Sequence, residues 1–88
     1  MSNTSVIESS IREFLASNFG FRGATADMDG KRDLLAGGIL DSTAVLEVVA
    51  FVENDLGVKV EDQEMLPENL GSILNIVAFV ERKLRAVS

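Results

Sequence analysis

A serine stands where a helix is expected to begin, directly after a glycine-rich connection. The stretch reads Gly37-Gly38-Ile39-Leu40-Asp41-Ser42. A hydroxyl in the first turn of a helix is exposed, lies close to free backbone N–H groups and is held on a fixed scaffold, so Ser42 is well placed for covalent modification. Asp-Ser after glycine is also a common helix start, in which Asp41 caps the helix and Ser42 is simply compatible with the first turn. The dipeptide alone favours that structural role.

The side chains that most often perform chemistry are absent from the sequence. It has no cysteine and no histidine, and therefore no thiolate nucleophile and no imidazole base. A hydrolase that uses Ser42 is a poor interpretation, because the glycine pattern of a nucleophile elbow is also missing. The sequence also does not form a calcium-binding loop. If Gly30 is aligned with the turn glycine of such a loop, Thr25 takes the first ligand position and Ala36 takes the position of the bidentate glutamate. We expect a protein that is not an enzyme and holds no metal ion.

The middle third of the chain is strongly acidic. The net charge is −6, and residues 41–68 contain eight acidic residues against one basic residue, Lys59. This sign opposes binding to a phosphate backbone, so nucleic acid is not expected as a partner. A basic protein surface is the natural complement. The excess of like charge also predicts that salt or divalent cations raise the melting temperature.

Length and composition indicate one small domain. The chain has 88 residues, of which 47% are hydrophobic, and this fits a single folded domain over residues 1–88 with a modest core. The first residues do not have the pattern of a signal peptide, and no apolar run approaches the roughly 20 residues of a membrane span. We therefore expect a cytoplasmic monomer with no membrane partner.

Apolar spacing predicts an all-α fold, a small four-helix bundle with three main helices, a short third helix and a long loop between helices one and two. The first helix is expected over about residues 4–18, with Ser5 and Glu8 as a capping box and Gly20 as its stop. The connection over residues 20–41 is long enough to be functional or internally packed. Four apolar residues should hold it against the core: Leu34, Leu35, Ile39 and Leu40.

The second helix should start at Asp41 or Ser42 and end near Leu56, with Gly57 as its C-cap. After it, Val58-Lys59-Val60 is interpreted as an extended connector, because no other strand pattern exists to pair with it. The apolar stripe of this helix is expected to consist of Val45, Val48, Val49, Val52 and Leu56.

A short third helix is expected over about residues 62–66, ending before Pro67. The fourth helix should follow Ser72 as N-cap. Basic residues near its end suit the negative pole of the helix dipole, and they are Arg82, Lys83 and Arg85. Its buried stripe should consist of Ile73, Ile76, Val77, Val80 and Leu84.

Three stretches follow one another in the order of a known pattern. They are Gly38-Ile39-Leu40-Asp41-Ser42, Glu53-Asn54-Asp55-Leu56-Gly57-Val58-Lys59-Val60, and Pro67-Glu68-Asn69-Leu70-Gly71-Ser72. Together with the long glycine-containing loop and the number of helices, they resemble the acyl and peptidyl carrier protein family over nearly the whole length of the chain. Each stretch alone is a weak signal, whereas the three in this order are a strong one.

The resemblance implies that Ser42 carries 4′-phosphopantetheine derived from coenzyme A, and that Asp41 takes part in recognition by the phosphopantetheinyl transferase. A phosphodiester on Ser42 would lie near the positive end of the second helix. The protein would then be a non-catalytic carrier that tethers acyl or aminoacyl intermediates as thioesters. Its partners would be the transferase, a loading ligase or acyltransferase, and downstream synthase enzymes of fatty acid, polyketide or nonribosomal peptide biosynthesis.

One position departs from the pattern of the family. Many fatty-acid carriers have leucine directly after the serine, whereas this chain has Thr43. We therefore expect a freestanding carrier of a specialised, secondary-metabolite pathway. The alternative is an unmodified acidic helical module that docks a basic partner, and ordinary solvated charge would also explain the acidic residues. The residues expected to meet partners are Thr43, Leu46, Glu47, Ala50, Glu53, Glu61, Asp62 and Glu64.

Overall fold

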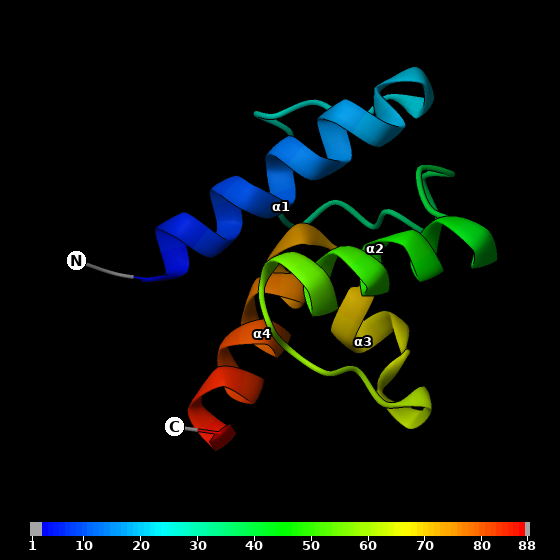
Figure 1. The fold of residues 1–88 in the computed structure, drawn as a ribbon. Coiled ribbons are helices and arrows are strands. Elements are labelled where there is room, and N and C mark those ends of the chain that lie inside the picture. Colours follow the sequence, from blue (N-terminus) through cyan, green and yellow to red (C-terminus); the bar gives the residue numbers. More distant parts are fainter. Residues whose placement is uncertain (1–2, 88) are drawn as a thin grey trace.

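The computed structural model describes residues 3–87, which form a small bundle of helices (Figure 1). No strand occurs in this part of the chain. The predicted all-α fold, with a long connection between the first two helices and a short third helix, is confirmed. The elements are α1 (Asn3–Phe19), the 3₁₀ turn η1 (Gly20–Arg22), α2 (Ser42–Asp55), the 3₁₀ turn η2 (Asp62–Glu64), α3 (Pro67–Leu70) and α4 (Ile73–Val87).

Aliphatic side chains from the helices and from the long connection share one core, and α4 packs against both α1 and α3. The predicted stripes of α2 and α4 face this core, and only Val45, Leu56 and Leu84 of these stripes are half-buried rather than buried. Phe79 of α4 is also enclosed, which the predicted stripe missed. None of the helices within residues 3–87 has both the length and the apolar character that a membrane crossing requires. Side chains with almost no exposure include Ile11, Leu15, Leu34, Ile39, Val52, Ile76 and Val80.

The bounds of α1 agree with the prediction to within one residue, but the residues that cap its two ends differ from it. Ser5 lies within the helix, which already includes Asn3, so Ser5 and Glu8 do not form a capping box at its start. At the other end the chain passes from α1 directly into η1, and the turn is closed by Gly23 rather than Gly20. Gly23 has a φ of 101°, a left-handed value that glycine adopts at little cost. Gly20 has no such φ, but it directly follows the last residue of α1, so the predicted end of the α-helix at this position is confirmed.

The third helix lies later in the chain than predicted. Residues 62–64 form only the turn η2, and the α-helix begins at Pro67. Proline suits the first position of a helix because its φ is already helical and the missing N–H would have no partner there. The prediction treated Pro67 as a stop signal and overlooked this second use.

The long connection is anchored in the core, as predicted. Leu34 is fully buried, its N–H donates to the carbonyl of Gly71 at 2.7 Å, and its own carbonyl accepts from the N–H groups of Ile39 and Leu40. These bonds tie the connection to the segment before α4 and turn its last residues back toward α2. The chain therefore reaches Asp41 from a fixed support.

Candidate functional site

Ser42 is the first residue of α2 and is exposed to solvent. Asp41 precedes it in an extended conformation and caps the helix: its Oδ1 accepts the N–H of Ala44 at 2.8 Å, and its carbonyl accepts the N–H of Val45. The predicted start of the second helix is confirmed, and so is its end, because Leu56 is the C-cap residue and Gly57 follows with a φ of 71°. The hydroxyl of Ser42 is thus held at the positive end of a 14-residue helix.

Arg22 of η1 reaches this helix start, which the sequence did not indicate. Its Nη1 lies 3.2 Å from Oδ2 of Asp41 and 3.4 Å from the carbonyl of Ile39. The guanidinium also lies 5.2 Å from the centre of the exposed Phe21 ring. The hydrogen bond from the N–H of Ala44 holds the pKa of Asp41 below its ordinary value, and Arg22 lowers this pKa further. Asp41 therefore keeps its negative charge beside Ser42 at neutral pH.

A groove of about 320 Å³ opens beside Ser42, between α2 and the segment that leads through α3. Its walls are mainly apolar, and two of them, Leu46 and Leu66, are 57% and 41% exposed. Two exposed leucines therefore line the same groove as Ser42. Besides Ser42, the lining consists of Leu35, Val45, Leu46, Met65, Leu66, Pro67 and Leu70.

The residues predicted to meet partners fall into two groups. Thr43, Leu46, Glu47 and Ala50 lie along α2, and all four side chains are exposed, as the prediction of an exposed side requires. Their role in partner binding stays a prediction. The second group lies at or after the end of α2, and its members differ in the hydrogen bonds and ion pairs that they make within the protein. It consists of Glu53, Glu61, Asp62 and Glu64.

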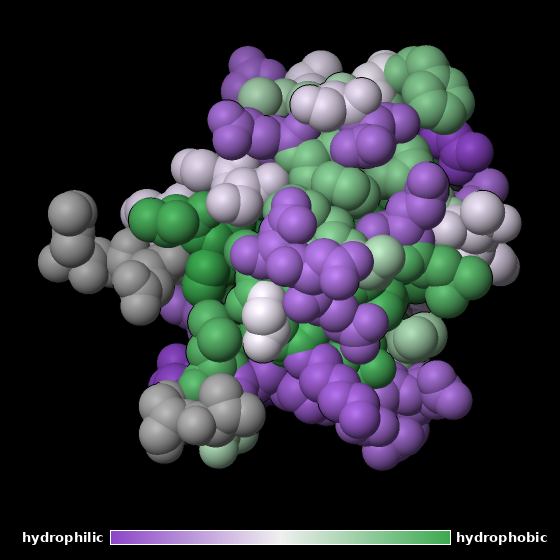
Figure 2. All heavy atoms as spheres, viewed as in Figure 1, coloured by the Kyte–Doolittle hydropathy of each residue, from purple (hydrophilic) through white to green (hydrophobic). Residues whose placement is uncertain are grey.

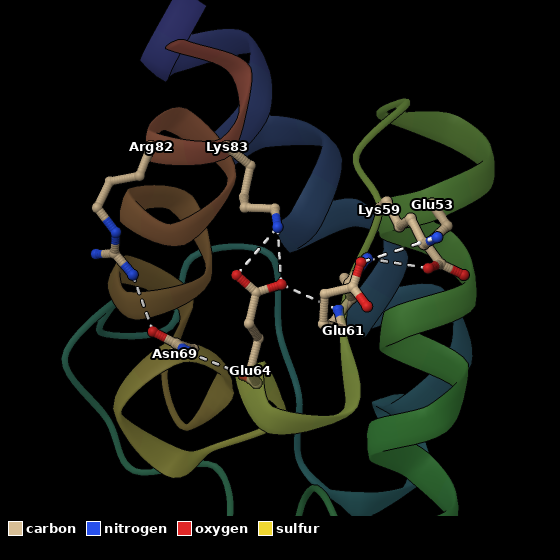
Figure 3. Close-up of polar contacts among 8 residues, drawn as sticks. Glu53, Lys59, Glu61, Glu64, Asn69, Arg82 and Lys83 are labelled. Atoms are coloured by element: carbon tan, nitrogen blue, oxygen red, sulfur yellow. Dashed lines mark hydrogen bonds and ion pairs between the residues drawn. The ribbon is translucent and has the colours of Figure 1, made fainter. Parts of the chain in front are cut away.

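Glu64 is the most engaged of these acids (Figure 3). Lys83 of α4 donates to both of its carboxylate oxygens, at 2.7 and 3.0 Å, and the N–H of Glu61 donates to Oε1 at 2.9 Å. The hydrogen bond from Lys83 is the main cause of the lowered pKa of Glu64. Asn69 extends the network by donating to the carbonyl of Glu64 and accepting from Arg82, both at 2.9 Å. Lys83 and Arg82 thus bind side chains of the η2–α3 segment, a role that the helix-dipole interpretation had not included.

Glu53 and Glu61 make weaker connections. Glu53 is exposed and accepts the N–H of Val60 at 3.0 Å, so it helps to hold the extended connector after α2 (Figure 3). Glu61 lies 3.8 Å from Lys59, whose side chain is 80% exposed, and water screens such a pair. Asp62 has no ion pair among residues 3–87. The described residues contain no group of acidic side chains arranged to hold a metal ion.

One comparison with known proteins found a relative, and another found none. No protein-family model matches the chain. A curated relative, the probable acyl carrier protein PigG of a Serratia strain, is 29% identical over 77 residues, which cover 88% of this chain and 87% of that protein. The likeness therefore spans the long connection, Ser42 and the helices on both sides, and it coincides with a fold of four helices. The sequence is therefore similar to that of a probable acyl carrier protein, and the small all-helical fold is consistent with this similarity.

Proposed function

We propose that this protein is a carrier that tethers acyl or aminoacyl groups on 4′-phosphopantetheine attached to Ser42, and that it presents them to partner enzymes. The observation that carries the proposal is the position of Ser42: an exposed hydroxyl on the first residue of α2, directly after a capping aspartate, in a chain that resembles acyl carrier proteins. The protein itself performs no catalysis in this proposal. It is a substrate of a phosphopantetheinyl transferase, of a loading ligase or acyltransferase, and of downstream synthases.

The residues around Ser42 suit the attached group. A phosphodiester on the Ser42 oxygen would lie at the N-terminus of α2, where free N–H groups and the helix dipole favour negative charge. Asp41, held by the N–H of Ala44 and by Arg22, would give the transferase a fixed carboxylate to recognise. When bound, phosphopantetheine supplies the thiol that forms the thioester, and this chain contains no cysteine that would compete with it.

The groove beside Ser42 supports a role in holding cargo. Its apolar walls would remove an apolar acyl chain from water, with a gain of about 0.8 kcal/mol for each buried methylene group. Thr43, next to Ser42, gives the exposed side of α2 a smaller and more polar surface than a leucine would. We therefore place the carrier in a specialised, secondary-metabolite pathway rather than in primary fatty-acid synthesis.

The test is the intact mass of the protein after incubation with coenzyme A and a broad-specificity phosphopantetheinyl transferase. We expect one phosphopantetheine on the wild type and none on Ser42→Ala. Ser9→Ala is the matched control, because it removes an exposed serine hydroxyl from α1 and should still be modified. A folded wild type that stays unmodified would refute the proposal. The alternative, an acidic docking module, would then be favoured, and it predicts that Ser42→Ala remains fully functional.

A further inference from the structure

The 3₁₀ turn η1 brings an arginine to the start of α2. Figure 1 shows η1 and the first turn of α2 at the same end of the molecule, and Figure 2 shows apolar surface next to strongly hydrophilic surface at the upper right, where η1 lies. Arg22 bonds there to Asp41 and Ile39, and its side chain is 31% exposed. Its guanidinium also lies 6.0 Å from the ring centre of Phe19 and 5.2 Å from that of Phe21. Two acceptors and two aromatic rings therefore hold this guanidinium in place.

More than half of the hydrogen-bonding capacity of Arg22 is unused. An arginine has five N–H donors, of which Nη1 carries two, Nη2 two and Nε one. Both bonds of Arg22 come from Nη1, and neither Nη2 nor Nε has an acceptor among residues 3–87. Three donors of a half-buried cation in a fixed position are thus left for another group.

The cap of α2 does not depend on this arginine. Asp41 caps the helix through Oδ1, which accepts the N–H of Ala44, whereas Arg22 contacts the other carboxylate oxygen. The side chain of Asp41 is 58% exposed, and water screens an ion pair of this kind, so it contributes little to stability. Support of the helix start is therefore not a sufficient role for a fixed arginine with three open donors.

We propose that Arg22 is a positioning residue for the phosphopantetheine arm and donates through its open N–H groups to the phosphodiester on Ser42. This inference rests on the proposed carrier function. A phosphodiester has two free oxygens and one negative charge, and the planar arginine fork matches such a group better than the point charge of a lysine does. It would stand on the residue next to the Asp41 carboxylate, so a cation shared by the two anions offsets their repulsion. Arg22 then holds the phosphate end of the arm, and the thiol end stays free to move between partners.

The first test is the phosphorus-31 NMR spectrum of the modified protein, whose intact mass shows one attached phosphopantetheine. We expect the phosphodiester resonance of Arg22→Gln to shift away from the wild-type position, toward that of the urea-unfolded protein, and that of Arg22→Lys to lie between the two. Arg82→Gln is the matched control, because Arg82 also bonds to a side chain and lies over a phenylalanine ring, but on α4. It should keep the wild-type resonance. Equal resonances of wild type and Arg22→Gln would overturn the proposal.

The Nε–H resonance of the arginine needs no variant. On modification of the wild type, the resonance of Arg22 should shift and that of Arg82 should not. An unchanged Arg22 resonance would overturn the proposal, even if a variant of Arg22 proved to be a poor substrate of the transferase.

Melting temperatures separate a contact with the arm from support of Asp41 alone. Wild type and Arg22→Gln are compared before and after modification. We expect the substitution to lower the melting temperature by about 2–4 °C more in the modified form, the size expected for one exposed charge pair in a small domain. Equal losses in the two forms would mean that Arg22 supports only Asp41, and would overturn this proposal alone. A wild type that never acquires phosphopantetheine would overturn the carrier proposal together with it.

Discussion

Replacing Leu34 with alanine should destabilise the protein strongly, although Leu34 lies in a connection and not in a helix. Its side chain is 0% exposed. Three carbon groups would be lost, at about 0.8 kcal/mol of transfer free energy each. The cavity left behind adds to this, so the expected cost is about 3–5 kcal/mol, as in other buried leucine-to-alanine substitutions. The backbone bonds of residue 34 to Gly71, Ile39 and Leu40 remain possible in the variant.

Urea unfolding measured by circular dichroism provides the assay. A cost of 3 kcal/mol corresponds to a fall in melting temperature of at least about 12 °C for a domain of this size. Leu46→Ala is the matched control, because it deletes the same atoms from a side chain that is 57% exposed, and it should cost less than about 1 kcal/mol. Ile39→Val, at another buried position of the connection, should cost about 0.5–1.5 kcal/mol and leave a protein that folds.

The reasoning is refuted if Leu34→Ala costs no more than Leu46→Ala while the dependence of the unfolding free energy on urea is unchanged. The connection would then not be part of the core, and Ser42 would be delivered by a loosely held segment. A large loss for Leu34→Ala together with a measurable loss for Ile39→Val supports a rigid support beneath the start of α2.

Three further predictions concern the rest of the fold. Gly57→Ala should lower the free energy of unfolding by about 1–2 kcal/mol, because Gly57 has a left-handed φ of 71°. Gly20→Ala is the control: Gly20 also has open space around it but no left-handed φ, so this variant should be as stable as the wild type. Equal melting temperatures of the two variants would contradict the prediction. The pKa of Glu64 is lowered, so its pair with Lys83 stabilises the fold above the ordinary glutamate pKa of 4.5 and loses this effect as the pH falls through the folded-state value. The difference in unfolding free energy between wild type and Lys83→Met should therefore shrink as the pH falls below that range, and a constant difference would argue against the pair. Sodium chloride should raise the melting temperature because the net charge is −6, and a decrease would show that self-repulsion is not the dominant charge effect.

The parts of the fold that local signals determine could be predicted from the sequence. Asp41 caps α2 through a bond to a residue three positions later, and Gly57 ends the same helix through its own backbone conformation. Ser72 caps α4 in the same local way, by accepting the N–H of Asn75. Pro67 shows the limit of such reading, because proline is compatible both with the residue after a helix and with the first residue of one.

The contacts around the candidate site could not be predicted in the same way. Arg22 and Asp41 are 19 residues apart, as are Glu64 and Lys83, and no spacing rule connects residues at that separation. Each pair depends on how the chain between them packs. Sequence reasoning could find Ser42 and its cap, but only the fold shows which basic residue fixes the aspartate.

The acidic residues of the chain therefore do not form one uniform docking surface. Glu64 is paired with a half-buried lysine and holds η2 against α4, so it offers a partner little charge. Glu47 and Asp55 have no ion pair among residues 3–87, and together with Phe51 they lie on one face of α2, because residues four positions apart are neighbours on a helix. Ser42 and Leu46 line the groove at the start of α2. Exposed acidic side chains on α2 therefore lie beside one groove, between α1 and α2, and the hydroxyl of Ser42 lies beside a different and largely apolar one.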